Sequence, residues 1–383
     1  MYNRLLFLST LLACLFGIIP SHASQNPYIV IDADSGTILA ENRADHRWYP
    51  ASLTKLMTAY VTFRAIQAGA IEDGSPVEIS RAATRQPPSR MGYKRGVKLR
   101  VDTALRIIII KSANDVSLAL AEAVAGTLEN FVSRMNAEAT RLGLNNTRFA
   151  NSNGLHNASQ YSSARDMALL SARILQEFPQ YAGMFSAVAI KTPAKTHYSY
   201  NLLLERFPGS TGMKTGFVCA SGYNMVASAR IDGRHLIAVV LGRESQTDRA
   251  VSAAKLITTA SNSTGTGSVY AARNRGAEPT NMRPVMCSDA ARAARYDPGA
   301  GAAVIKSEHL QPRRKSANIL SIVTGGVDTD PSDAWLTRKF TVTGKVPVPS
   351  KRPDYDPLTG KVILVAIGNR ETGRLPVPTP RPR

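Results

Sequence analysis

Ser52 and Lys55 lie three positions apart and form the first candidate for chemistry in this sequence. On a helix, residues with this spacing lie on the same face, so the hydroxyl and the amine would meet. An amine packed against apolar neighbours loses its proton more easily and can then accept the hydroxyl proton, which makes the serine a nucleophile. Because Ser252 and Lys255 repeat the spacing, the pair is weak evidence by itself.

Two further short motifs carry polar side chains that suit the cleavage of an amide. Ser112 and Asn114 follow an apolar run, where a hydroxyl can relay a proton and a side-chain amide can hold a substrate carbonyl. Lys214 and Thr215 offer a cation and a hydroxyl to a carboxylate, and Gly216 lets a ligand backbone lie close to a strand edge. Each motif is weak by itself, and the order in which they occur carries the argument.

Apolar periodicity and turn signals predict the elements that position these motifs. The expected strands cover residues 28–32, 37–40, 223–230 and 235–241, and the expected helices cover 52–68, 103–111, 115–126, 128–142, 164–177 and 249–260. The first motif therefore opens a helix, and the second follows one. The third lies on a strand before the hairpin that turns at Asp232 and Gly233.

The three motifs occur in the order Ser-x-x-Lys, Ser-x-Asn and Lys-Thr-Gly, which is the set found in penicillin-binding proteins and class A β-lactamases. Residues 26–258 resemble the low-molecular-mass penicillin-binding proteins that are serine-type D-alanyl-D-alanine carboxypeptidases. The stretches that carry the resemblance are PASLTKLMT (50–58), KSAND (111–115), FANSNGL (149–155) and TGMKTGF (211–217).

The resemblance implies an α/β (α+β) fold of the penicillin-binding protein/β-lactamase-like transpeptidase type. In this fold, an antiparallel sheet built from the N-terminal hairpin and the C-terminal strands packs against helices. A helical region from about residue 50 to residue 200 would close the cleft. Ser52, Ser112 and Lys214 would meet where the two regions join.

The resemblance also implies a role for each motif residue. Ser52 would attack the carbonyl between the two terminal D-alanines of a peptidoglycan stem peptide, with Lys55 as general base and Ser112 passing the proton to the departing amine. Backbone N–H groups of Ser52 and Phe217 would form the oxyanion hole, and water would hydrolyse the acyl-enzyme. The expected substrate-binding residues are Asn114, Lys214, Thr215, Gly216, Phe217 and Arg249. No metal or cofactor is expected, and β-lactams, which mimic the D-Ala-D-Ala amide, should acylate Ser52.

Other functions fit the sequence less well. A class A β-lactamase needs a glutamate a few dozen residues after Ser-x-Asn, and no glutamate lies between Glu138 and Glu177. The six histidines form no closely spaced set of zinc ligands. An endopeptidase that cleaves D-Ala-crosslinked peptides would use the same residues and stays an open alternative, as does a non-catalytic penicillin-binding wall module.

Composition limits the class of protein. The 383 residues are 44% hydrophobic and 20% charged, which suits a globular chain and excludes a disordered chain or a polytopic membrane protein. Lys and Arg outnumber Asp and Glu by 47 to 28, so the net charge is +19 and polyanions are expected to be attracted. The sequence carries no nucleic-acid-binding pattern, so a wall or membrane polyanion is the better candidate.

The N-terminus has the layout of a secretory signal peptide. One basic residue is followed by an apolar run to Pro20, and Ser21 and Ala23 supply small residues for cleavage. We therefore expect residues 1–23 to be a signal peptide and the chain to be exported to the periplasm or cell envelope. Two cysteines then remain, Cys219 and Cys287, and the sequence leaves open whether they form a disulfide or stay free thiols.

The rest of the chain divides into two parts that differ in amino-acid composition. Residues 24–260 are expected to form the catalytic domain. Residues 261–383 begin with a linker-like stretch and become rich in proline and arginine, so we expect a basic and mostly disordered C-terminal region. This region has no long apolar run and no clear amphipathic helix at its end. We therefore expect it to touch anionic wall or membrane surface, and the mode of membrane attachment stays open.

Overall fold

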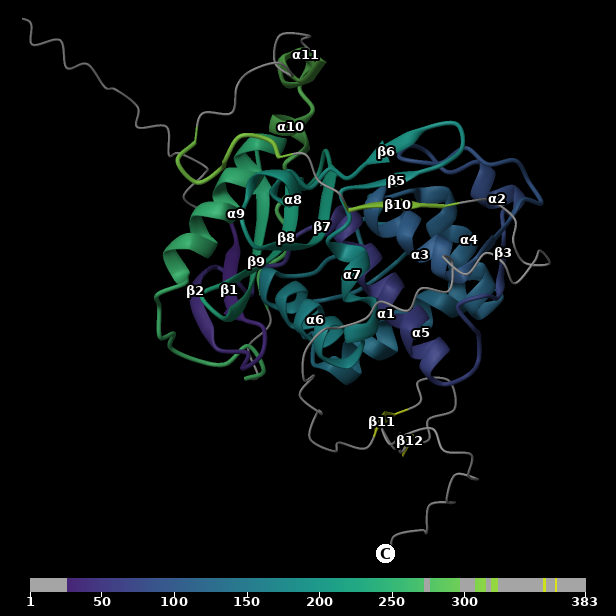
Figure 1. Ribbon diagram of the computed structural model, residues 1–383, viewed down its shortest axis with the longest axis horizontal. Coiled ribbons are helices and arrows are strands. Elements are labelled where there is room, and N and C mark those ends of the chain that lie inside the picture. Colours follow the sequence, from purple (N-terminus) through teal and green to yellow (C-terminus); the bar gives the residue numbers. More distant parts are fainter. Residues whose placement is uncertain are drawn as a thin grey trace, which may run out of the picture.

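A five-stranded antiparallel sheet joins the two ends of the folded body (Figure 1). The computed structural model describes residues 26–271, 276–296, 307–314 and 318–322, together with the backbone of 354–355 and 362–363. The strand order is β2-β1-β9-β8-β7. The strands are β1 (Tyr28–Asp32), β2 (Ile38–Asn42), β7 (Ser210–Val218), β8 (Gly222–Ile231) and β9 (Arg234–Arg243). The expected sheet of N-terminal hairpin and C-terminal strands is thus confirmed, and β7 lies at one edge.

Helices cover both faces of this sheet (Figure 1). In β9, Leu236, Ala238 and Val240 pack with helix α9 (Gln246–Ala260), whereas Ile237 and Val239 belong to the core on the opposite face. That second core includes α6 (Ala164–Glu177). Because successive side chains of a strand point to opposite faces, a strand that is buried on both sides needs an almost continuous apolar run.

The helical region follows the sequence periodicity closely. Its short elements are η2 (Ala51–Leu53), α2 (Arg81–Thr84), η3 (Pro179–Tyr181), α7 (Ala182–Phe185) and α8 (Leu203–Arg206), and its longer helices are α1 (Thr54–Gln67), α3 (Val101–Ile110), α4 (Asn114–Ala125) and α5 (Leu128–Leu142). Ser163 caps α6 by accepting a hydrogen bond from the Asp166 N–H. The predicted helices therefore agree with the structure to within a few residues.

The region between residues 50 and 200 is less purely helical than expected. A small hairpin pairs β3 (Pro76–Glu78) with β4 (Lys98–Arg100). A second pairs β5 (Ala189–Lys191) with β6 (Thr196–Tyr198), and β10 (Ile319–Ser321) adds to β5 in parallel. These strands have three residues each, which is too short for an alternating pattern to be distinguished from a loop. A further pair, β11 (Asp354–Tyr355) with β12 (Val362–Ile363), completes the described strands.

Several of the described stretches that follow α9 pack on the body, while most of residues 261–383, the region expected to be mostly disordered, lie outside the described residues. Thr37 and Ser268 form an antiparallel bridge, and Val269 is buried. Farther along lie the short helices α10 (Arg283–Met286) and α11 (Asp289–Tyr296), and Cys219 and Cys287 form a disulfide. The expected signal peptide lies outside the described residues. Among the helices that are described, none is both long enough and apolar enough to cross a membrane.

Candidate active site

The three sequence motifs meet between the sheet and the helical region. Ser52 lies in η2, Ser112 lies in the turn between α3 and α4, and Lys214 lies on the edge strand β7. Lys55 Nζ is 3.1 Å from Ser52 Oγ, and Lys214 Nζ is 2.9 Å from Ser112 Oγ. The structure thus brings together two pairs, each made of a lysine amine and a serine hydroxyl.

The Lys55 amine has three hydrogen-bond partners, which together orient it. Nζ donates to Asn114 Oδ1 at 2.8 Å and to the Asn153 carbonyl at 2.5 Å, in addition to its contact with Ser52. The Asn114 amide is fixed in this orientation because its Nδ2 donates to the Pro87 carbonyl. Of these three partners, only the Ser52 hydroxyl can also donate. A neutral Lys55 would therefore give its two hydrogens to the oxygens and turn its lone pair toward Ser52.

The electrostatic environment favours a neutral Lys55. The side chain is fully buried at the start of α1. This burial lowers its pKa well below the ordinary lysine value, and the nearby positive charge of Lys214 lowers it further, while the Asp115 carboxylate acts in the opposite direction. Burial also lowers the pKa of Lys214 to about 7, with a second contribution from the Arg249 guanidinium.

Two residues of the site, Ala51 directly before Ser52 and Ser112 itself, adopt left-handed backbone conformations. Ala51 has φ 49° and Ser112 has φ 63°. Non-glycine residues in this region cost on the order of 1–3 kcal/mol each, and they persist only where the surrounding structure holds them. At Ser112, the Lys214 ammonium bonds the hydroxyl and also donates to the Thr215 carbonyl. The site therefore holds strained backbone directly before Ser52 and at Ser112.

The basic loop of residues 85–97 borders the site. Asp115, one residue beyond Asn114, accepts hydrogen bonds from the backbone N–H groups of Met91 and Gly92. The Asn114 N–H donates to the Ser89 carbonyl at 2.6 Å. Asp115 thus fixes the loop against the start of α4. The sequence reasoning assigned no role to Asp115 or to the Asn153 carbonyl, although both lie within stretches that carried the resemblance.

Glycine is required where two backbone segments approach Ser52. Gly154 has φ 84°, and a Cβ there would lie 1.9 Å from the Ala51 carbonyl oxygen. A Cβ on Gly216 would lie 2.9 Å from the Ser52 nitrogen. These contacts place β7 and the 149–155 segment directly against η2, so both segments help to fix the Ser52 backbone.

The other expected site residues lie around this centre. Thr215 and Phe217 follow Lys214 on β7, and the Phe217 ring packs on Tyr223. Arg249 is buried in the first turn of α9, where it donates to the Tyr200 carbonyl at 2.8 Å and lies over the Tyr223 ring. Burial lowers the Arg249 pKa to about 10, so the guanidinium is still charged at neutral pH. The Arg249 charge acts on the site by helping to lower the pKa of Lys214.

The second Ser-x-x-Lys match lies elsewhere. Ser252 and Lys255 are on α9, and the Lys255 side chain is exposed. The Ser252 hydroxyl donates to the Asp248 carboxylate. Because the Lys255 amine is exposed, this pair lacks the burial that distinguishes Lys55.

Comparisons with known proteins agree with the geometry. A family model described as D-alanyl-D-alanine carboxypeptidase matches residues 19–245. The D-alanyl-D-alanine carboxypeptidase DacA of Haemophilus influenzae is 37% identical over 247 residues, which cover 63% of each chain. DacC of Escherichia coli K12 is 38% identical over 244 residues, which cover 60% of each chain. The match therefore spans less than two thirds of the length of these curated relatives.

Solved structures give the same result. Penicillin-binding protein 5 from Haemophilus influenzae superimposes with a TM-score of 0.58 at 36% identity, covering 61% of this chain and 69% of that one. Penicillin-binding protein D2 from Listeria monocytogenes, in a cefotaxime-bound form, gives 0.57 at 27% identity and covers 62% and 98% of the two chains. With more than half of its length matched by the family model, the chain belongs to the D-alanyl-D-alanine carboxypeptidase family S11, the low-molecular-mass penicillin-binding proteins.

Proposed function

We propose that the chain is a serine-type D-Ala-D-Ala carboxypeptidase that removes the terminal D-alanine from peptidoglycan stem pentapeptides through an acyl-enzyme on Ser52. The observation that carries this proposal is the pair of lysine–serine contacts at one site. Lys55 Nζ lies 3.1 Å from Ser52 Oγ, and the other two hydrogen-bond partners of Nζ are oxygen atoms that only accept. Lys214 Nζ lies 2.9 Å from Ser112 Oγ. Such contacts are what an activated hydroxyl and a separate proton relay require.

Acylation follows from this arrangement. The neutral Lys55 amine takes the Ser52 proton as Oγ attacks the carbonyl between the two D-alanines. Backbone N–H groups of Ser52 and Phe217 stabilise the negative charge that forms on the carbonyl oxygen, by about 3–4 kcal/mol for a donor of this kind. The Ser112 hydroxyl passes a proton to the departing amine, the C–N bond breaks, and D-alanine leaves. Water then attacks the ester, which releases the shortened peptide and restores Ser52.

The edge position of β7 suits a peptide substrate. An edge strand presents backbone N–H and C=O groups that an extended peptide can pair with. Lys214 and Thr215 on that strand, with Arg249 behind them, would bind the terminal carboxylate of the substrate. This arrangement supports cleavage at the C-terminal end of a chain, because cations at the site would favour a substrate with a free terminal carboxylate.

Once a β-lactam has acylated Ser52, the acyl-enzyme is expected to be hydrolysed slowly. No glutamate lies between Glu138 and Glu177 in the sequence, and both of these side chains have partners other than Ser52. Glu138 pairs with Arg141, and Glu177 accepts a hydrogen bond from Tyr60. A glutamate that activates a deacylating water, as in class A β-lactamases, is therefore not supported. β-Lactams should act as acylating inhibitors here.

The direct test locates the acyl group. The chain is incubated with a penicillin and digested, and mass spectrometry identifies the modified peptide, while D-alanine release from a D-Ala-D-Ala peptide is measured in parallel. The proposal expects one penicillin per chain on the peptide that contains Ser52, with D-alanine released. An adduct on Ser252, or no adduct on folded protein, would contradict it. An adduct without D-alanine release, but with cleavage of a crosslinked dimer, would indicate an endopeptidase.

The pKa of Lys214 predicts a pH-dependent affinity for carboxylates. Because this pKa is lowered to about 7, the amine is charged below pH 7 and neutral above it. The Kd of a peptide that ends in D-Ala-D-Ala, measured on Ser52→Ala, should therefore rise about tenfold between pH 6 and pH 8.5. The same peptide with a C-terminal amide, or the double variant with Lys214→Gln, should show a flat profile. A flat profile for the free carboxylate would exclude Lys214 as its cation.

We further propose that residues 1–23 are a signal peptide and that the chain acts in the periplasm or cell envelope. We place the catalytic domain at residues 24–260, and we propose that the basic region beyond it contacts anionic wall or membrane surface. The layout of the N-terminal sequence and the excess of basic residues support these points. Envelope fractionation of the full chain and of a chain lacking residues 295–383 tests the last one, since equal distribution of the two would contradict it.

A further inference from the structure

The segment of residues 276–287, here called the strap, contacts the chain shortly before η2 and the turn directly after β7, the two elements that supply the backbone of the proposed oxyanion hole. Its first half lies against the chain just before Ser52. The Gly276 N–H donates to Asn146 Oδ1 at 2.6 Å, and a Cβ on Gly276 would lie only 1.8 Å from the Asp45 carbonyl oxygen. Glu278 pairs with Arg47, and Thr280 is hydrogen-bonded to His46.

The second half of the strap lies against the turn that follows β7. The Met282 N–H donates to the Ala220 carbonyl at 3.0 Å, and the Met282 side chain lies close to Gly222. Met282 and Met286 are buried in the core that also contains Trp48. Cys287 is bonded to Cys219, two residues beyond Phe217. The strap therefore ends in a covalent bond beside the active-site strand.

The two elements also contact each other directly beneath the strap. The Trp48 indole donates to the Ser221 carbonyl at 2.9 Å, and the Asn224 amide donates to the Tyr49 carbonyl at 2.9 Å. These bonds join the chain before Ser52 to the β7–β8 hairpin. The strap contacts the chain on both sides of this junction, and its disulfide restricts the movement of one side relative to the other.

We propose that the strap and its Cys219–Cys287 disulfide are a positioning device that fixes the Ser52 and Phe217 backbone N–H groups relative to each other. The inference rests on the proposed acyl-serine chemistry. An oxyanion hole acts only when both donors lie about 2.7–3.1 Å from the position of the oxyanion, so a small shift between η2 and β7 slows acylation. The strap does not touch the substrate and acts through these backbones.

The test separates this positioning role from a general effect on folding. In the double variant Cys219→Ser/Cys287→Ser, the first-order rate constant of acylation by a fluorescent penicillin at saturation should fall about tenfold, since a displacement of about 1 Å can cost a hundredfold. The concentration for half-maximal rate should stay within about twofold. Partial unfolding would instead lower the amount of label bound and leave the rate constant of the labelled fraction unchanged.

Reduction of the wild-type chain provides a second measurement and a rescue. A dithiol breaks the S–S bond, both cysteines become thiols, and the dithiol is oxidised to its own disulfide. The reduced chain should match the double variant, and reoxidation should restore the original rate constant. A reduced chain that acylates at the wild-type rate would overturn the proposal. If the oxidised wild type itself is not acylated, the proposed function fails instead, and the two failures are thereby distinguished.

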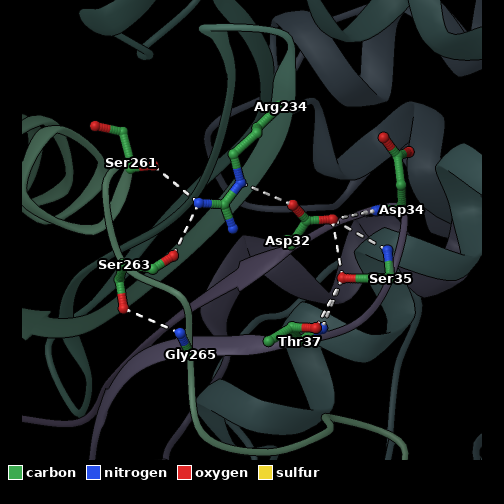
Figure 2. Close-up of polar contacts among 8 residues, drawn as sticks. All are labelled: Asp32, Asp34, Ser35, Thr37, Arg234, Ser261, Ser263 and Gly265. Carbon is green, nitrogen blue, oxygen red and sulfur yellow. Dashed lines mark hydrogen bonds and ion pairs between the residues drawn. The ribbon is translucent and has the colours of Figure 1, made fainter.

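A polar cluster at the opposite end of the sheet offers the matched control (Figure 2). Arg234 donates to the Ser261 and Ser263 carbonyls at 2.8 and 2.9 Å and pairs with Asp32, so it attaches the start of the chain after α9 to the body. Arg234→Gln loosens this attachment, which lies at the end of the sheet opposite to Phe217. The variant should lower the melting temperature and leave the acylation rate constant unchanged. An equal fall of the rate constant in Arg234→Gln would contradict a role specific to the strap.

Discussion

Replacing Lys55 by glutamine is expected to lower the rate of Ser52 acylation by about a thousandfold, within the range that a general base contributes. Glutamine can still donate to the Asn153 carbonyl, but its amide nitrogen has no basic lone pair. The Ser52 hydroxyl then loses the one partner that can take its proton. Time courses of fluorescent penicillin labelling measure the rate directly.

The same variant should fold at least as well as the wild type. Burial lowers the pKa of Lys55 well below its ordinary value, so folding at neutral pH removes the proton that Lys55 carries in the unfolded chain, at a free-energy cost. A neutral side chain of similar length removes this cost. Thermal unfolding should therefore show an unchanged or higher melting temperature, as is common when a functional residue is replaced.

Lys255→Gln is the control that the chain itself provides. Lys255 repeats the spacing of Lys55 but is exposed on α9. Its replacement should leave both the labelling rate and the melting temperature unchanged. If Lys55→Gln acylates within about tenfold of the wild-type rate, then Lys55 is not the base. The lysine–serine pair of Lys214 and Ser112 would then be the remaining candidate.

The sequence predicted the parts of the fold in which local pattern and tertiary packing agree. The α5 helix has its apolar residues on one face and a threonine at the N-cap, and its predicted bounds of 128–142 match the structure. The start of α9 was placed three residues too late, at Arg249 instead of Gln246. Ser245 accepts a hydrogen bond from the Asp248 N–H and so begins the helix before its first buried residue.

The packing of the chain after α9 could not be predicted, because its physical basis is a backbone pairing. Residues 261–268 are small and polar and read as a linker. In the structure, the Ile38 N–H donates to the Gly267 carbonyl, and the Thr266 N–H donates to the Ile38 carbonyl. These bonds cover the outer edge of β2, where a strand would otherwise expose its backbone groups. Small residues permit this contact without producing an apolar signal.

The site was predicted from the motifs, but the contacts of Asn114 were not. The sequence reasoning expected its amide to hold the stem peptide. In the structure, its oxygen accepts from Lys55 and its nitrogen donates to the Pro87 carbonyl. Orienting the base is thus a further function of this amide, and binding of the substrate stays a proposal. The Pro87 carbonyl comes from a loop whose position depends on Asp115, and no local pattern specifies that loop.

Gly216→Ala is expected to lower the acylation rate constant by about a hundredfold, because a displacement of the Ser52 backbone by about 1 Å is enough to cost this much. A Cβ at this position would lie 2.9 Å from the Ser52 nitrogen and 3.1 Å from the Pro50 carbonyl oxygen. Both neighbours are backbone atoms and cannot rotate away. Either β7 or η2 must therefore shift, and the shift moves the Ser52 N–H relative to Phe217.

Gly267→Ala tests whether this loss is specific. A Cβ on Gly267 would meet only the end of the Ile38 side chain, at 3.8 Å, which is an ordinary contact. Both substitutions add one methyl group beside a strand, so their effects on the unfolded chain are alike. Gly267→Ala should leave acylation unchanged. If Gly216→Ala labelled as fast as Gly267→Ala, close contact between β7 and η2 would not set the rate, and positioning of the two N–H groups would lose its support.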